Sequence, residues 1–84
     1  MPVIARFYGL IIKMFFIGSE HNPPHIHISY GEHNAILNVN TLKIIEGDLP
    51  ARAEKMVVEW AGEHQAELIK MWENQQFKEL EPLK

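Results

Sequence analysis

The sequence predicts an α+β fold, a small and largely antiparallel sheet of four or five strands followed by helix packed on one face. Apolar and β-branched residues dominate the first half of the chain with a period of two, and apolar residues recur every three or four positions in the second half. With 84 residues the chain is too short for two cores, so we expect one domain over residues 1–84. Strands are expected over about 2–46, helix over about 49–75 and a short tail over 76–84.

Two β-rich runs open the chain, Val3–Phe7 and residues 10–17, with Gly9 between them. They predict either a hairpin or one long bent strand. In the second run both faces are apolar and only Lys13 is charged. A strand of this kind needs cover on two sides. We therefore expect helices on one face of the sheet, and the tail, a second copy or another protein on part of the other.

The next two strands are predicted as a hairpin with a defined register. Ile26, Ile28 and Tyr30 alternate with His25, His27 and Ser29. Gly31-Glu32 fits a two-residue loop with glycine at the position that needs a positive φ. The aliphatic residues of both strands then share one face, and the histidines are expected to face away from the core. The predicted pairs are Tyr30 with His33, Ile28 with Ala35, Ile26 with Leu37, His27 with Ile36 and His25 with Asn38.

A weaker β-rich run over residues 42–46 predicts a fifth strand, after a turn near Asn40-Thr41. Asp48 is then the expected cap of a helix that has Pro50 in its first turn, where the missing N–H costs nothing.

An apolar stripe at helical spacing continues through about residue 72. One helix of some 25 residues would be about 37 Å long, more than this domain covers, so Gly62 is expected to kink it or split it in two. The stripe contains Leu49, Ala53, Met56, Val57, Trp60, His64, Leu68, Met71 and Trp72. His64 is expected to be a hydrogen-bonded core histidine.

The cysteine count, the lengths of the apolar runs and the net charge exclude or disfavour several kinds of site and partner. The absence of cysteine excludes disulfides, thiolate metal sites and cysteine nucleophiles. No secretory signal and no apolar run of membrane-spanning length is visible, so a cytoplasmic location without membrane attachment is expected. The net charge of −3 disfavours duplex nucleic acid but leaves RNA open. A core this small benefits from a partner, so a homo-oligomer or a small partner protein is expected.

The most concentrated chemistry is a cluster of three histidines, His21, His25 and His27. Residues two apart on a strand place both imidazoles on one face about 6–7 Å apart, and the rigid Pro23-Pro24 step folds His21 toward them. Three neutral imidazoles predict a site for a divalent transition metal such as zinc, with Glu20, Glu32 or water as a further ligand.

Two other interpretations of the cluster stay open. His25 and His27 also suit catalysis without a metal, as a general acid and base near neutral pH. Alternatively, the histidines have a structural or interface role, because a histidine on an exposed strand face commonly hydrogen-bonds to water or to a neighbour.

Arg6, Tyr8 and Tyr30 are candidate binding residues. Strand alternation places Arg6 and Tyr8 on one face, and with Lys13 and Tyr30 they would stabilise a phosphate group if gathered near the histidines. Such a site would resemble a metal-free ribonuclease. The alternative is that Arg6 is an ordinary solvated surface residue.

Several short motifs spread over essentially the whole chain resemble the domain of unknown function 4160 family. They are Arg6-Phe7-Tyr8-Gly9, His21-Asn22-Pro23-Pro24-His25-Ile26-His27, Tyr30-Gly31-Glu32, Leu49-Pro50, Glu59-Trp60-Ala61 and Glu81-Pro82-Leu83. The resemblance implies a small bacterial protein without an established activity, often encoded beside another small uncharacterised protein. Some members carry labels as transcriptional regulators or toxin–antitoxin components. Thr41-Leu42 departs from the turn-like sequence common after the fourth strand of the family.

Two functional hypotheses follow. In the first, the chain is an accessory protein of a toxin–antitoxin-like or regulatory two-gene module and acts through protein–protein contacts. In the second, His21, His25 and His27 form a metal-dependent or acid/base site for phosphodiester cleavage, as in a ribonuclease.

Overall fold

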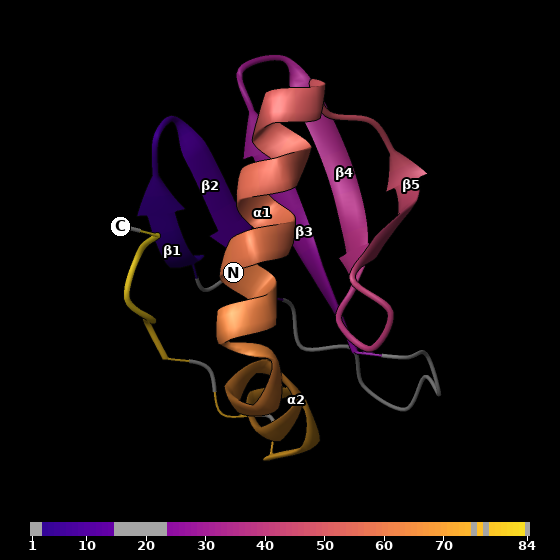
Figure 1. Cartoon of the computed structure of the whole chain (residues 1–84). Helices are drawn as coiled ribbons and strands as arrows, with labels where there is room; N and C mark the ends of the chain where they lie inside the picture. Colours follow the sequence, from indigo (N-terminus) through magenta and orange to yellow (C-terminus); the bar gives the residue numbers. More distant parts are fainter. Residues whose placement is uncertain (1–2, 15–23, 75, 77, 84) are drawn as a thin grey trace.

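The computed structural model describes residues 3–14, 24–74, 76 and 78–83. Its strands form one antiparallel sheet in the order β1-β2-β3-β4-β5, followed by two helices (Figure 1). The α+β prediction is confirmed, with five strands and with two helices rather than one. The elements are β1 Val3–Phe7, β2 Leu10–Lys13, β3 His25–Tyr30, β4 His33–Asn38, β5 Lys43–Gly47, α1 Ala51–Glu63 and α2 Gln65–Asn74.

β1 and β2 form a tight hairpin, which decides between the two arrangements that the sequence left open. Phe7 pairs with Leu10, so Tyr8 and Gly9 alone make the turn. Their φ angles are 49° and 85°, both in the left-handed region. A two-residue turn with positive φ at both positions matches the twist of the flanking strands.

The β3–β4 hairpin has the register that the turn chemistry predicts. All five predicted pairs occur, from Tyr30 opposite His33 to His25 opposite Asn38. Gly31 has a φ of 58°, as its place in the loop requires. Ile26 and Ile28 are buried in the core, which confirms the face assigned to the aliphatic residues.

The fifth strand is confirmed, one residue further along than predicted at each end. Its pairing with β4 shifts between Ile36 and Leu37, so that Ile36 lies opposite Glu46 and Leu37 opposite Ile44. Gly47 ends the strand with a φ of 79°, and a Cβ there would overlap the backbone of Asn34. Only glycine fits this close approach of β5 to β4.

The prediction that Asp48 caps the first helix is wrong. Pro50 is the residue before α1, and its carbonyl accepts a hydrogen bond of 2.9 Å from the Glu54 N–H. Asp48 is held instead at the end of the sheet, where its N–H donates to the Asn34 carbonyl at 3.3 Å. Its exposed carboxylate lies 3.6 Å from Nδ1 of the half-buried His33.

The two helices meet at His64 and not at Gly62. α1 continues through Gly62 to Glu63, and His64 leaves the helical conformation with φ −112° and ψ 15°. His64 is half-buried, with its ring 5.0 Å from that of Trp60, so it lies at the margin of the core.

α1 buries one side against the sheet, and this contact forms the core (Figure 1). Its buried residues are Ala53, Val57, Trp60 and Ala61. They belong to one cluster with the inward residues of the strands, which include Ile4, Leu10, Ile12, Met14, Ile26, Ile28, Ala35 and Leu37. Neither described helix is long and apolar enough to span a membrane.

The described part of the tail docks on the outer edge of β1. The Leu80 N–H donates to the Ile4 carbonyl at 2.7 Å, and the Leu80 side chain is buried. The indole Nε1–H of Trp60 donates to the Glu81 carbonyl at 2.8 Å. These residues therefore close the core and the sheet edge, rather than covering the face opposite α1. Phe77 lies outside the described residues.

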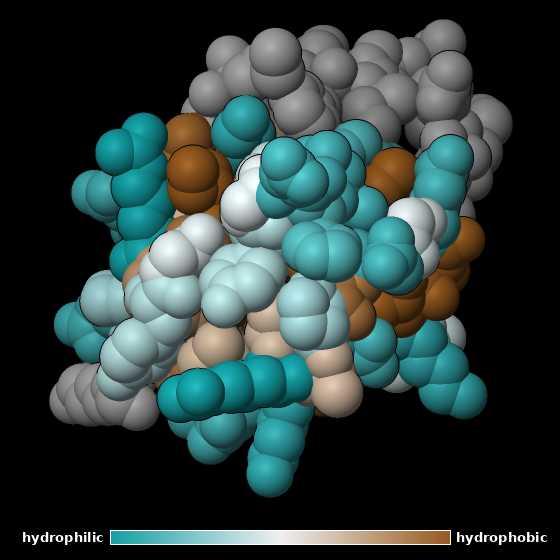
Figure 2. All heavy atoms as spheres, turned by 90° about the horizontal axis from the view of Figure 1, so that it is seen from above, coloured by the Kyte–Doolittle hydropathy of each residue, from teal (hydrophilic) through white to brown (hydrophobic). Residues whose placement is uncertain are grey.

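The end of the molecule that carries the β1–β2 and β3–β4 turns has a mainly hydrophilic described surface (Figure 2). Hydrophobic atoms gather at the side where β5 lies. Ile45 of β5 is 54% exposed.

Candidate functional site

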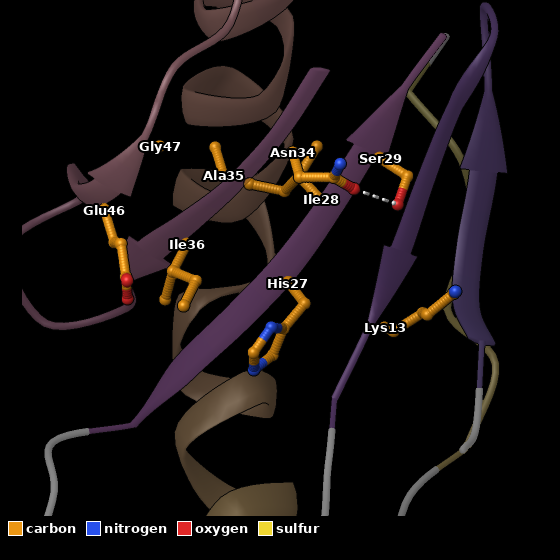
Figure 3. Close-up of a pocket in the computed structure, with 9 residues that line it drawn as sticks. All are labelled: Lys13, His27, Ile28, Ser29, Asn34, Ala35, Ile36, Glu46 and Gly47. Atoms are coloured by element: carbon orange, nitrogen blue, oxygen red, sulfur yellow. Dashed lines mark hydrogen bonds between the residues drawn. The ribbon is translucent and has the colours of Figure 1, made fainter. Parts of the chain in front are cut away.

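The sheet face opposite α1 carries polar and apolar side chains together, and we call it the second face. Strand pairing places Ile11 beside Ser29, Ser29 beside Asn34, Lys13 beside His27, and His27 beside Ile36. Figure 3 looks onto this face, with the ribbon of α1 behind the strands. The second face comprises Ile11, Lys13, His27, Ser29, Asn34 and Ile36.

A groove of about 480 Å³ runs across this face. Lys13 stands at one side and Glu46 at the other, with His27 and Ile36 between them (Figure 3). The groove thus places a cation, an imidazole, an aliphatic side chain and a carboxylate in one row across four strands.

His27 is half-buried in this groove, and its pKa lies below the ordinary value of a histidine. Partial burial is the main cause, because it disfavours the charged imidazolium. Nearby His25 and Lys13 lower the pKa further, whereas the Glu46 carboxylate partly opposes them. The imidazole is therefore neutral at pH 7, the state that accepts a proton or binds a metal.

His25 is 7% exposed, which strand alternation did not predict. It begins β3, and the ring of Trp72 in α2 lies 4.9 Å from its ring. Alternation assigns a side chain to a face of the sheet, but it does not reveal that a later helix reaches the end of that strand. Of the two histidines in β3, His27 is the one in the groove.

The rings of His25 and His27 are 5.2 Å apart, with an angle of 60° between their planes. In a tetrahedral zinc site with Zn–N distances of about 2.0–2.1 Å, two imidazole centroids lie about 5 Å apart. The spacing of this pair fits two ligands of one metal ion. The third predicted ligand, His21, is outside the described residues, and within those residues no group of three histidine or acidic side chains could hold a metal.

A short polar pair borders the groove. The Ser29 hydroxyl donates a hydrogen bond of 3.2 Å to Oδ1 of Asn34 (Figure 3). The hairpin register places Ser29 opposite Asn34, so this pair follows from the predicted pairing of β3 and β4. Glu46 was not predicted as a site residue either, because the shifted pairing of β5 sets its position in the groove.

The three predicted binding residues divide between two other cavities. Arg6 lines a cavity of about 420 Å³ with tail residues 79–82. Tyr8 and Tyr30 line one of about 530 Å³. Strand alternation does not extend to Tyr8, because that residue lies in the left-handed turn after β1.

The cavity lined by the two tyrosines lies at the opposite end of β3 from the buried His25. His25 begins that strand and Tyr30 ends it. Arg52 and Met56 of α1 complete the cavity at the tyrosine end. The structure therefore does not gather Arg6, Tyr8 and Tyr30 around the histidines.

The family model described as domain of unknown function (DUF4160) matches residues 9–73. The chain belongs to this family. The matched segment contains the second-face groove and the His25–His27 pair. No curated protein and no solved structure matches the chain.

Proposed function

We propose that this DUF4160 chain is a cytoplasmic bacterial accessory protein of a toxin–antitoxin-like or regulatory two-gene module, and that it acts through protein–protein contacts. The observation that carries the proposal is the mixed character of the second face. Ile11 and Ile36 remain half-buried there, next to Lys13, His27 and the grooved surface. Aliphatic side chains with a few polar groups among them are typical of protein interfaces.

The packing of the sheet also supports a partner contact on the second face. α1 and the inward faces of the strands already form a complete core, and the tail closes the edge at β1. The second-face isoleucines are not needed for that core. A partner or a second copy would bury them and add stability to a domain with a small core.

The test is to express the untagged chain alone and together with the product of the adjacent gene, and to measure masses by size-exclusion chromatography with light scattering. We expect a dimer or a complex with the neighbour. Ile36→Lys should abolish it by placing a charge in the contact, while Glu59→Lys on the exposed side of α1 should leave it intact. A monomer at high micromolar concentration that binds no neighbour would contradict the proposal.

A second candidate is histidine chemistry at His25 and His27, which the ring separation of 5.2 Å and the lowered pKa of His27 favour. A neutral imidazole beside a second one suits zinc binding, in which His21 would be a further ligand, or acid/base cleavage of a phosphodiester in RNA.

Elemental analysis of protein purified without a histidine tag tests the metal, and a ribonuclease assay tests the reaction. Activity that falls at least a hundredfold in both His25→Ala and His27→Ala would support catalysis. His33→Ala is the matched control, because His33 is a half-buried histidine near Asp48 that does not line the groove. Absence of both metal and histidine-dependent activity would retire this candidate.

A further inference from the structure

A cavity near the β1–β2 and β3–β4 turns is lined by two tyrosines, an arginine and a methionine, none of which is fully buried in the core. Tyr8 from the β1–β2 turn and Tyr30 from the end of β3 face the first turns of α1 across a space of about 530 Å³. Arg52 and Met56 line it from the helix side. They are four residues apart in α1 and so lie on the same side of that helix.

Tyr8 is unusual in both its backbone and its exposure. Its φ of 49° is left-handed, a conformation that glycine, asparagine or aspartate adopts more readily than an aromatic residue. Its side chain is 60% exposed, so burial in the core does not offset that strain. The turn requires this positive φ, and the Tyr8 ring contacts the Phe7 ring edge-on, with 6.2 Å between their centroids. The exposed part of the ring can contact a ligand.

The second ring lies beside the neighbouring turn residue. A Cβ at Gly9 would lie 3.4 Å from Cε1 of Tyr30, which is van der Waals distance, so the Tyr30 ring lies against the turn. The two tyrosines therefore offer aromatic surface from the β1–β2 turn and from the end of β3, at one end of the sheet. Figure 2 looks onto this end, where atoms of intermediate hydropathy lie among hydrophilic ones.

The electrostatics of the cavity favour an anion. Among the described residues, Arg52 is the only charged one that lines the cavity, and no carboxylate forms an ion pair with it. Arg52 is also the second residue of α1, where the helix dipole adds partial positive charge. A guanidinium binds a phosphate or carboxylate through paired hydrogen bonds.

We propose that this cavity binds a small molecule that combines a flat aromatic ring with an anionic group, such as a nucleoside monophosphate. The tyrosines would stack on the ring, Met56 would contact its edge and Arg52 would bind the anion. The net charge of −3 disfavours a polyanion, so a single nucleotide fits better than a nucleic acid strand. This proposal goes beyond the partner contact on the second face.

The test is an NMR titration of the ¹⁵N-labelled full chain with AMP, UMP, phenyl phosphate and inorganic phosphate, each up to about 10 mM. We expect saturable shifts of the Tyr8, Gly9, Tyr30 and Arg52 amides with the three aromatic phosphates. Inorganic phosphate should bind at least tenfold more weakly, because it lacks the ring. Stronger binding of AMP and UMP than of phenyl phosphate would identify a nucleotide as the ligand. Equal binding would show that the site recognises any aromatic ring joined to a phosphate.

Three variants separate binding from folding. Tyr8→Asn should weaken AMP binding at least tenfold while keeping or raising the thermal midpoint, because asparagine suits the left-handed turn. Arg52→Gln should weaken it by a similar factor. Arg6→Gln removes the same charge from a different cavity and should leave the affinity unchanged.

Three results would overturn the proposal. One is the absence of shifts with every aromatic phosphate, and another is phosphate binding as strong as AMP binding. The third is an affinity for AMP that Tyr8→Asn leaves intact.

Discussion

The two faces of the sheet are formed by the same strands, yet they differ in how deeply their side chains are buried. On the face under α1, Ile12 and Ile28 are fully buried and belong to one continuous apolar cluster. On the second face, Ile11 and Ile36 are only half-buried. Ile36 lines the groove with Lys13 and His27, and Ile11 pairs with Ser29 at its border. Among the described residues, α1 covers one face of β2, whereas Ile11 and Lys13 on the other face stay half-buried. One face forms the core, and we propose that the other binds a partner.

The largest effect should come from the centre of the core. Trp60 is fully buried, and its indole N–H holds the tail at Glu81. Trp60→Ala should lower the free energy of unfolding by about 3–5 kcal/mol, measured by urea denaturation. Trp60→Phe keeps most of the ring and should cost clearly less. A loss below about 1 kcal/mol for Trp60→Ala would show that α1 is not the main cover of the sheet.

A matched pair of adjacent residues compares the faces directly. Ile12→Ala creates a cavity in the core and should cost about 2–5 kcal/mol in the same assay. Ile11→Ala removes the same atoms from the second face and should cost about 1 kcal/mol or less. Equal losses would mean that both faces are packed as core, which would contradict the comparison.

Gly47 tests the groove edge, where β5 approaches β4. Its positive φ and the overlap of a new Cβ with the Asn34 backbone predict a cost of about 2–4 kcal/mol for Gly47→Ala. Gly31→Ala is the control, since its φ is also positive but a Cβ there meets nothing within 4 Å. That substitution should cost about 1 kcal/mol. Similar losses at both glycines would argue against the close strand approach.

The smallest effect should be a pH dependence that originates on the second face. The pKa of His27 is lower in the folded chain than the ordinary value of about 6.5 that applies when it is unfolded. Below that value the unfolded state binds more protons, so this contribution reduces stability as the pH falls from about 7 toward the folded pKa. His27→Gln should flatten the slope of the urea midpoint against pH. An unchanged slope would contradict the burial of His27 in the groove.

Much of the fold could be predicted because its determinants are local. The Gly31-Glu32 turn and the alternation around it predicted all five observed pairs of the β3–β4 hairpin. The helical stripe likewise identified Ala53, Val57 and Trp60 as buried residues.

The candidate site could be predicted only in part, because its determinants are not local. The position of Glu46 depends on the irregular pairing of β5, and the burial of His25 depends on Trp72 from the far end of the chain. The expectation that Arg6 and Tyr8 share one face of a strand is wrong, because the strand ends at Phe7 and Tyr8 belongs to the turn. These features follow from tertiary packing, which a period of two or of 3.6 does not encode.

Methyl NMR of isoleucine-labelled protein tests the central claim most directly, because isoleucines lie on both faces of the sheet. Spectra would be compared between dilute chain and chain that is concentrated or mixed with the product of the adjacent gene. We predict that the Ile11 and Ile36 methyl signals shift on association, while those of the buried Ile12, Ile26 and Ile28 stay nearly unchanged. Shifts confined to other surfaces, or no shift under any of these conditions, would contradict a binding role for the second face.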